Sequence, residues 1–179
     1  LCVVDTASGA RVELGRGAHP RWAPDSHSLA FATSTLDRFA IERWHPASGQ
    51  RQAMVRLGEP PSALAWSPDG AQLAFVKRVP AEPSGPPAPA WEALRTSKWA
   101  APGVYSDKLI RRVEGYDREQ PDGHHHIFLL SAATGELRQL TDGPFEHGGP
   151  LVDVTKLGLA GRISWAPDGR HIVMSMQRP

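Results

Sequence analysis

The sequence has little cysteine, no long apolar run and almost no net charge. Its single cysteine, Cys2, excludes an internal disulfide framework and a multi-cysteine metal site, and it is compatible with the cytoplasm and the periplasm alike. The longest apolar stretches are about five residues, against the roughly 18 that a membrane span needs. Lysine and arginine total 20, and aspartate and glutamate total 19. Charges this balanced argue against a protein that binds nucleic acid by neutralising its phosphates.

Catalytic motifs are missing as well. The chain has no Gly-x-Ser-x-Gly pentapeptide of an α/β-hydrolase, no His-Glu-x-x-His, and neither a Gly-x-x-x-x-Gly-Lys nor a Gly-x-Gly-x-x-Gly phosphate loop. It therefore has no evident catalytic machinery. We assign no catalytic, cofactor-binding or metal-ligating residue to this chain and expect no cofactor.

Three adjacent histidines, His124, His125 and His126, are the feature closest to a metal-binding tract. They lead into a strand-like run, in which alternate side chains point to opposite faces, so that three neighbouring imidazoles do not converge easily. We therefore favour a polar junction between a turn and a strand. The other five histidines are scattered and give no support for coordination: His19, His27, His45, His147 and His171.

Both ends of the sequence interrupt strand-like runs. Leu1 lies inside an apolar run without an initiator methionine or a signal peptide before it, and Pro179 comes just after another such run. We therefore treat the sequence as a fragment of a longer protein.

Glycine and proline are abundant, at 17 each, and much of this content belongs to two alternating repeat units. The first unit is Trp-[Ala/Ser]-Pro-Asp-[Gly/Ser] followed by an apolar strand. Its tryptophans are Trp22, Trp66 and Trp165. The second unit is a strand followed by a Ser/Thr-Gly turn, and its glycines are Gly9, Gly49 and Gly135. Proline, aspartate and glycine have established roles in turns, so each unit predicts a hairpin rather than a chemical site.

The spacing of the repeats predicts the fold class. Trp22 and Trp66 are 44 residues apart, and Gly9 and Gly49 are 40 apart, as expected for one four-stranded propeller blade. The next intervals are longer by similar amounts, which predicts one insertion of about 45 to 55 residues within the following blade.

We therefore predict an all-β fold, a partial β-propeller of four-stranded antiparallel blades. It amounts to about three blades and is incomplete at both ends, whereas propellers typically have four to eight blades. We expect the remaining blades elsewhere in the parent chain. The predicted divisions are a half blade at 1–17, a blade at 18–58, a blade with an insertion at about 79–125 within 59–143, and a half blade at 144–179.

The predicted insertion begins with five prolines between Pro80 and Pro89, which indicate a stiff, extended and exposed segment. Residues 91–99 then predict a short helix, and residues 104–116 a strand and a turn. Long insertions in repeat arrays often lie on a functional face, although an exposed ornament explains this one equally well.

With the repeats laid out, the sequence resembles the β-propeller of the prolyl oligopeptidase family of serine peptidases, and most of all its acylaminoacyl-peptidase and dipeptidyl-peptidase-like bacterial members. The most specific stretch runs from Val104 to Pro150, where residues 104–116 look like the family's in-blade insertion and residues 126–143 like the hairpin that follows. TolB-type periplasmic propellers share the Trp-Ser-Pro-Asp-Gly units. Two departures are Ser26 in place of glycine and the extended link at 151–161.

The resemblance implies a parent enzyme with a C-terminal α/β-hydrolase domain that carries a Ser-Asp-His triad and is absent from this chain. The propeller would cap that domain and admit only short or unstructured peptides. In some family members propeller acids bind the free α-amine of the substrate, and Glu114 and Glu119 are the candidates here, although both also fit as ordinary exposed loop acids.

The implied function is thus the non-catalytic propeller portion of a serine peptidase, an exopeptidase or oligopeptidase, with peptide substrates. The alternative is a TolB-like or WD-repeat-like propeller that binds proteins and has no peptidase activity. A carbohydrate- or lyase-type propeller enzyme is a third reading, with less support because no cluster of acids or histidines repeats in each blade.

Overall fold

The computed structural model describes residues 1–35, 38–80, 123–149 and 162–177. Contacts divide the chain into two compact units, Leu1–Val79 with His124–Pro179 and Pro80–Gly123. Nearly all the described residues belong to the first unit. Most of the predicted insertion lies outside the described residues, as do Glu114 and Glu119.

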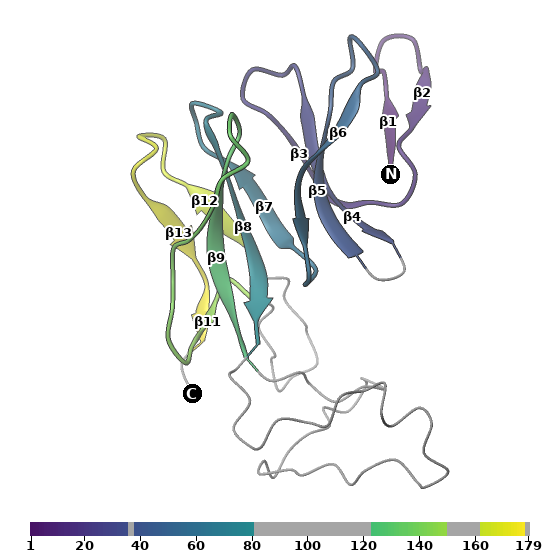
Figure 1. The fold of residues 1–179 in the computed structure, drawn as a ribbon. Helices are drawn as coiled ribbons and strands as arrows, with labels where there is room; N and C mark the ends of the chain where they lie inside the picture. Colours follow the sequence, from purple (N-terminus) through teal and green to yellow (C-terminus); the bar gives the residue numbers. More distant parts are fainter. Residues whose placement is uncertain (36–37, 81–122, 150–161, 178–179) are drawn as a thin grey trace, which may run out of the picture. The chain divides into compact units, whose positions relative to one another are not determined.

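The secondary structure of the described residues consists of β-strands, and eight of them form two four-stranded antiparallel sheets (Figure 1). The first sheet has the order β3-β4-β5-β6, with β3 at Ala18–Trp22, β4 at Leu29–Thr35, β5 at Arg38–Trp44 and β6 at Arg51–Leu57. The second has the order β10-β9-β8-β7, with β7 at Ser62–Trp66, β8 at Gln72–Val79, β9 at His124–Ser131 and β10 at Leu137–Gln139. The predicted all-β fold of four-stranded antiparallel sheets is confirmed.

The remaining strands form two-stranded pairs. β1 at Cys2–Val4 pairs with β2 at Arg11–Glu13, and β12 at Ile163–Trp165 pairs with β13 at Ile172–Met174. A third, shorter pair joins β11 at Glu146–His147 to β14 at Met176–Gln177.

Turn chemistry explains why the first repeat unit folds as a hairpin. In the turn between β7 and β8, the Gly70 N–H donates to the carbonyl of Ser67 at 2.9 Å. The Asp69 carboxylate accepts from the Ser67 hydroxyl at 2.6 Å and from the Ala71 N–H at 3.0 Å. Gly70 itself has a φ of 70°, in the left-handed region that glycine occupies without strain. The Trp-Ser-Pro-Asp-Gly unit therefore builds its own turn from local contacts.

The sheets pack face to face through apolar side chains. One buried cluster joins the first sheet to the second and includes Ile41, Leu64, Phe75 and Leu130. A second cluster joins the second sheet to the β12–β13 hairpin, and a third joins the β1–β2 hairpin to the first sheet. The first strands of the three Trp hairpins contact one another in turn, β3 with β7 and β7 with β12. This order of stacked sheets is the packing that a propeller requires.

Each of these first strands carries an irregularity at the same place. The register of β3 shifts between Ala18 and Arg21, where His19 has a φ of 53°. The register of β7 shifts between Ser62 and Ala65, where Ala63 has a φ of 51°. A β-bulge at matching positions in two strands is a regular part of the repeat rather than a local defect.

In the third repeat the same strand is split in two. His147 of β11 pairs with Met176, and Ile163 of β12 pairs with Met174, so only Ser175 separates the two pairs on the partner side. Gly148, with a φ of 69°, stands at the bulge position. The extended link at 151–161 is therefore inserted at the bulge in the first strand of the third Trp hairpin.

Candidate functional site

The candidate site is a cluster of polar side chains where β9 begins. His124, His125 and His126 are the first three residues of β9, and the sequence between β8 and β9 is the predicted insertion. Opposite them lies β11, with Glu146 and His147, which immediately precedes the second inserted segment. The cluster therefore joins the two places at which extra sequence is inserted into the sheets.

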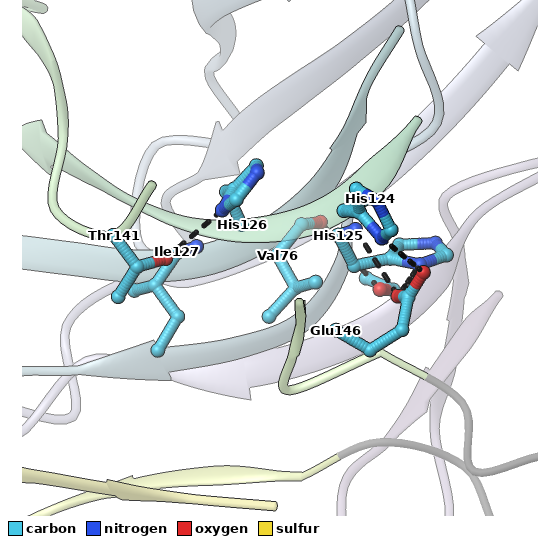
Figure 2. Close-up of polar contacts among 8 residues, drawn as sticks. Val76, His124, His125, His126, Ile127, Thr141 and Glu146 are labelled. Atoms are coloured by element: carbon cyan, nitrogen blue, oxygen red, sulfur yellow. Dashed lines mark hydrogen bonds and ion pairs between the residues drawn. The ribbon is translucent and has the colours of Figure 1, made fainter. Parts of the chain in front are cut away.

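Glu146 and His125 form the closest contact of the cluster. The Nδ1 atom of His125 donates to Oε2 of Glu146 at 2.6 Å, and the backbone N–H of His125 donates to the same oxygen at 3.1 Å. His124 approaches from the same strand, with Nδ1 3.5 Å from Oε1 (Figure 2). Two of the three adjacent imidazoles thus reach one carboxylate, which strand alternation alone does not predict.

The pKa of Glu146 reflects these contacts. Burial acts to raise the pKa, but the side-chain and backbone hydrogen bonds from His125, and then the charges of His125 and Arg78, outweigh it and hold the pKa below its ordinary value. The carboxylate of Glu146 is therefore ionised at neutral pH, and its Oε2 atom already accepts the hydrogen bonds from His125. That state suits an ion pair and leaves the group poorly placed to donate a proton.

The backbone beside this pair has no room for a side chain. A Cβ atom on Gly149 would lie 2.8 Å from the His125 ring and 2.9 Å from Oε2 of Glu146. Any larger residue at this position would push the two partners apart. Gly149 is thus required by close approach, in the way that glycine commonly is where backbone meets a packed polar group.

His126 lies apart from this pair and packs against His147. Their ring centroids are 5.1 Å apart, and both side chains are buried. Nδ1 of His126 lies 3.4 Å from the Thr141 hydroxyl, which also accepts the N–H of Ile127 at 3.0 Å (Figure 2). Burial, followed by the charges of His147 and His124, lowers the pKa of His126, although Glu146 and Asp142 oppose this in part. His126 is therefore neutral at pH 7.

The cluster suits an anchor better than a reaction centre. Within residues 1–35, 38–80, 123–149 and 162–177, no group of three or more His, Cys, Asp or Glu side chains is arranged to hold a metal ion. The contacts instead tie β9 to β11 through the pair of His125 and Glu146 and through the packing of two tilted imidazoles, those of His126 and His147. These contacts hold together the ends of β9 and β11, next to which the two extra segments are inserted.

A hollow lies beside the bulge of β3. It has a volume of about 300 Å³ and is lined by His19, Thr33, Ser34 and Phe39, together with Pro60 and Pro61. Burial, and then the charge of Arg21, lowers the pKa of His19. The lining contains the hydroxyl groups of Thr33 and Ser34 but no acidic side chain, so the hollow has no arrangement that indicates a reaction.

The structure brings together residues that no sequence pattern connects. We assigned no role to Glu146 from the sequence, and we counted His147 among the histidines that give no support for coordination. The signal that was present is the pair Gly148-Gly149 directly after them, because adjacent glycines often mark a close approach of backbone. No helix among the described residues is long and apolar enough to span a membrane.

Comparisons with known proteins agree with this architecture. No family model matches the chain. The uncharacterized peptidase YuxL of Bacillus subtilis is 22% identical over 180 residues, an alignment that covers 98% of this chain and 24% of YuxL. The chain therefore spans about a quarter of the length of this curated relative.

Solved structures match the fold at low sequence identity. Acylaminoacyl peptidase of Pyrococcus horikoshii superimposes with a TM-score of 0.59 at 13% identity, over 86% of this chain and 24% of that one. A putative TolB of Agrobacterium tumefaciens gives 0.53 at 16% identity, over 98% and 50%. Dipeptidyl peptidase 4 of Porphyromonas gingivalis gives 0.50 at 15% identity, over 92% and 22%. The chain is thus a β-propeller portion that resembles those of acylaminoacyl peptidase, dipeptidyl peptidase 4 and TolB, and a distant homologue of the peptidase YuxL.

Proposed function

We propose that this chain is the non-catalytic propeller portion of a serine peptidase and that it controls which peptides reach a C-terminal α/β-hydrolase domain of the whole protein. The observation that carries the proposal is the match to YuxL, which covers 98% of this chain but only 24% of a protein named as a peptidase. A chain without a nucleophile motif that aligns with part of a peptidase fits a non-catalytic domain of such an enzyme.

The proposed mechanism is selection by size. Stacked four-stranded sheets form a stiff wall, because every sheet is buried against the next through apolar clusters. We propose blades at 18–58 and 59–143 and half blades at 1–17 and 144–179, with the first strands β3, β7 and β12 nearest the axis. An extended peptide passes through the opening of such a propeller, whereas a folded protein does not.

The cluster around Glu146 supports this proposal by fixing the base of the inserted segments. His125 and Glu146 hold β9 to β11 where both segments are inserted. Glu114 and Glu119 lie in the first inserted segment, where a carboxylate would pair with the α-amine of an entering peptide. We propose them as the amine-binding residues.

Labelling of the complete protein with a fluorophosphonate probe tests the proposal. We expect one serine to be modified, in a Gly-x-Ser-x-Gly sequence outside residues 1–179. Replacement of Glu114 and Glu119 by glutamine should then raise KM for peptides with a free amine and leave KM for N-blocked peptides unchanged. A complete protein that neither reacts with the probe nor hydrolyses peptides would overturn the proposal.

A TolB-like protein-binding propeller is the second candidate function. It is supported by the superposition on the putative TolB, which extends over 98% of this chain with a TM-score of 0.53. Affinity capture with the complete protein distinguishes the two candidates. A saturable protein partner, with no serine that reacts with the probe, would favour the binding function.

A further inference from the structure

The hollow beside the bulge of β3 is lined by the first sheet and by the segment that leads into the second. The first sheet supplies His19 of β3, Ser34 of β4 and Phe39 of β5, and the segment directly before β7 supplies Pro60 and Pro61. Its volume of about 300 Å³ is at the lower end of the range of about 300–1,000 Å³ that ligand pockets span. The hollow therefore suits one amino-acid side chain rather than a large molecule.

The repeat gives one wall of this hollow a counterpart at the next interface. Ser34 and Arg78 each lie 12 residues after the tryptophan of their own hairpin. Ser34 pairs with Phe39, and Arg78 pairs with His125. Phe39 and His125 therefore occupy the same position in successive sheets.

The opposite wall has a counterpart as well. His147 pairs with the eleventh residue after the tryptophan of its hairpin, and Ser62 pairs with the tenth residue after the tryptophan of its own. Pro61, which precedes Ser62, thus takes the place of His147. Pro60 takes the place of Glu146 in the same way.

At the second interface this place is filled by polar side chains. Nδ1 of His125 lies 2.6 Å from Oε2 of Glu146, and a Cβ atom on Gly149 would lie 2.8 Å from the His125 ring. The two partners therefore occupy each other and leave no room beside them for a further side chain.

At the first interface the same place is open and apolar. Phe39 and Pro60 stand where the next interface has His125 and Glu146, so no hydrogen bond joins the two side chains. Ser34, which stands where the next sheet has an arginine, is much shorter than its counterpart. The space that polar and long side chains fill at the second interface is thus left as the hollow.

The lining decides which chemistry the hollow accepts. It includes no aspartate, glutamate, lysine or arginine, and the Thr33 hydroxyl already donates to Oε1 of Glu42 at 3.1 Å. The lowered pKa of His19, caused first by burial and then by the charge of Arg21, keeps its ring neutral at pH 7. A charged group in the hollow would lose its hydration without gaining an ionic partner. An uncharged ring would instead pack against the rings of the lining.

We infer that the hollow is a subsite for one uncharged aromatic side chain of an entering peptide, and that the propeller selects peptides by side chain as well as by size. The inference rests on the proposed function, which places β3 among the strands nearest the axis. Phe39, Pro60 and Pro61 contact the aromatic ring, and the small side chain of Ser34 leaves the space that the ring fills.

Binding of capped tripeptides to the complete protein tests the inference. The protein is first treated with the fluorophosphonate probe so that no peptide is cleaved, and the probes are acetyl-Ala-Phe-Ala-amide and the same peptide with lysine or glutamate at the centre. We expect the phenylalanine peptide to bind about tenfold or more tightly than the other two. Equal affinities, or tighter binding of a charged peptide, would overturn the inference.

This measurement is separable from the proposed function. Both ends of the peptides are blocked, so Glu114 and Glu119 have no free amine to bind. Binding also does not depend on hydrolysis. The side-chain preference can therefore be absent where a reactive serine is found, and present where none is labelled.

Ser34→Arg places in the hollow the residue type that the next sheet carries at this position. It should weaken binding of the phenylalanine peptide by about tenfold or more, because the arginine side chain fills the space. Ser48→Arg, the same change in the exposed turn between β5 and β6, is the matched control and should bind like the unchanged chain. Unchanged binding in Ser34→Arg, or an equal loss in both variants, would overturn the inference.

Pro60→Glu tests the charge of the hollow by a gain of binding. It introduces the acid that the next interface carries as Glu146, so the preference should shift from the phenylalanine peptide to the lysine peptide. Pro46→Glu, in the exposed turn after β5, should keep the original preference. A gain of lysine binding cannot come from an unfolded variant, and an unchanged preference in a Pro60→Glu protein with the native circular dichroism spectrum would overturn the inference.

Discussion

Ser26 is the residue at which the turns of the three Trp hairpins differ. Gly70 and Gly169 hold the same position in the other two turns, with φ of 70° and 68°, and Ser26 has a φ of 61°. A side chain in the left-handed region is strained, and glycine is not.

We predict that Ser26→Gly stabilises the chain by about 1 kcal/mol, because it removes the strain of a non-glycine residue in this region. Urea unfolding followed by tryptophan fluorescence measures the change. Ala47→Gly, in the neighbouring exposed turn, is the matched control and should destabilise, since Ala47 does not have a positive φ. A loss of stability in Ser26→Gly would contradict the assignment of strain.

His126 and Glu146 make the folded chain less stable in acid. Because the pKa of His126 is lowered from 6.5, the unfolded chain binds protons more readily, and stability falls as the pH drops from about 6.5 through the folded pKa. Because the pKa of Glu146 is lowered from 4.5, its contribution is complete above that value and is lost as the pH drops through its folded pKa. The two losses therefore follow one another on acidification.

We predict that His126→Gln flattens the first of these losses. The free energy of unfolding, measured in urea at a series of pH values from 7 to 5, should depend less on pH than in the unchanged chain. His147→Gln should act in the same direction, because the electrostatic effect of His147 is one of the causes that lower the pKa of His126. His27→Gln, at an exposed turn residue, is the control and should leave the pH dependence as it is. An unchanged slope in both test variants would contradict the prediction.

At the scale of elements, the tryptophan contact between hairpins is the feature that repeats. Trp66 reaches the carbonyl of Arg21 across the interface between two sheets. A buried hydrogen bond of this kind contributes about 1 kcal/mol net.

Trp66→Phe should therefore cost about 1 kcal/mol or somewhat more, because it removes the donor, leaves the carbonyl unpaired and keeps most of the aromatic packing. Trp22→Phe is the matched control, since Trp22 is about half exposed and its indole N–H has no described acceptor, and it should cost much less. Equal losses in unfolding experiments would show that packing alone, and not the hydrogen bond, holds the hairpins together.

Those hairpins whose turns are formed by residues close together in the sequence could be predicted from the sequence. Each turn depends on residues within the same five-residue unit, such as Ser67, Asp69 and Gly70, so the repeat predicts the hairpins and their order. The first strand of the third Trp hairpin is divided into β11 and β12, and this division could not be predicted. It depends on the pairing of Ile163 with Met174 and of His147 with Met176, and the latter two are far apart in the sequence. The ion pair of His125 and Glu146 was missed for the same reason, since its partners meet only through that register.

At the scale of the whole molecule, the described sheets and hairpins are stacked one against the next. Three apolar clusters join them: β1–β2 to the first sheet, the first sheet to the second, and the second sheet to the β12–β13 hairpin.

The central claim is that this propeller admits extended peptides and excludes folded proteins. The most direct test is the hydrolysis, by the complete protein, of one peptide sequence presented free and presented in a surface loop of a folded carrier. The account predicts cleavage of the free peptide and of the unfolded carrier, and no cleavage of the folded carrier. Cleavage of the folded carrier at the rate of the free peptide would contradict it.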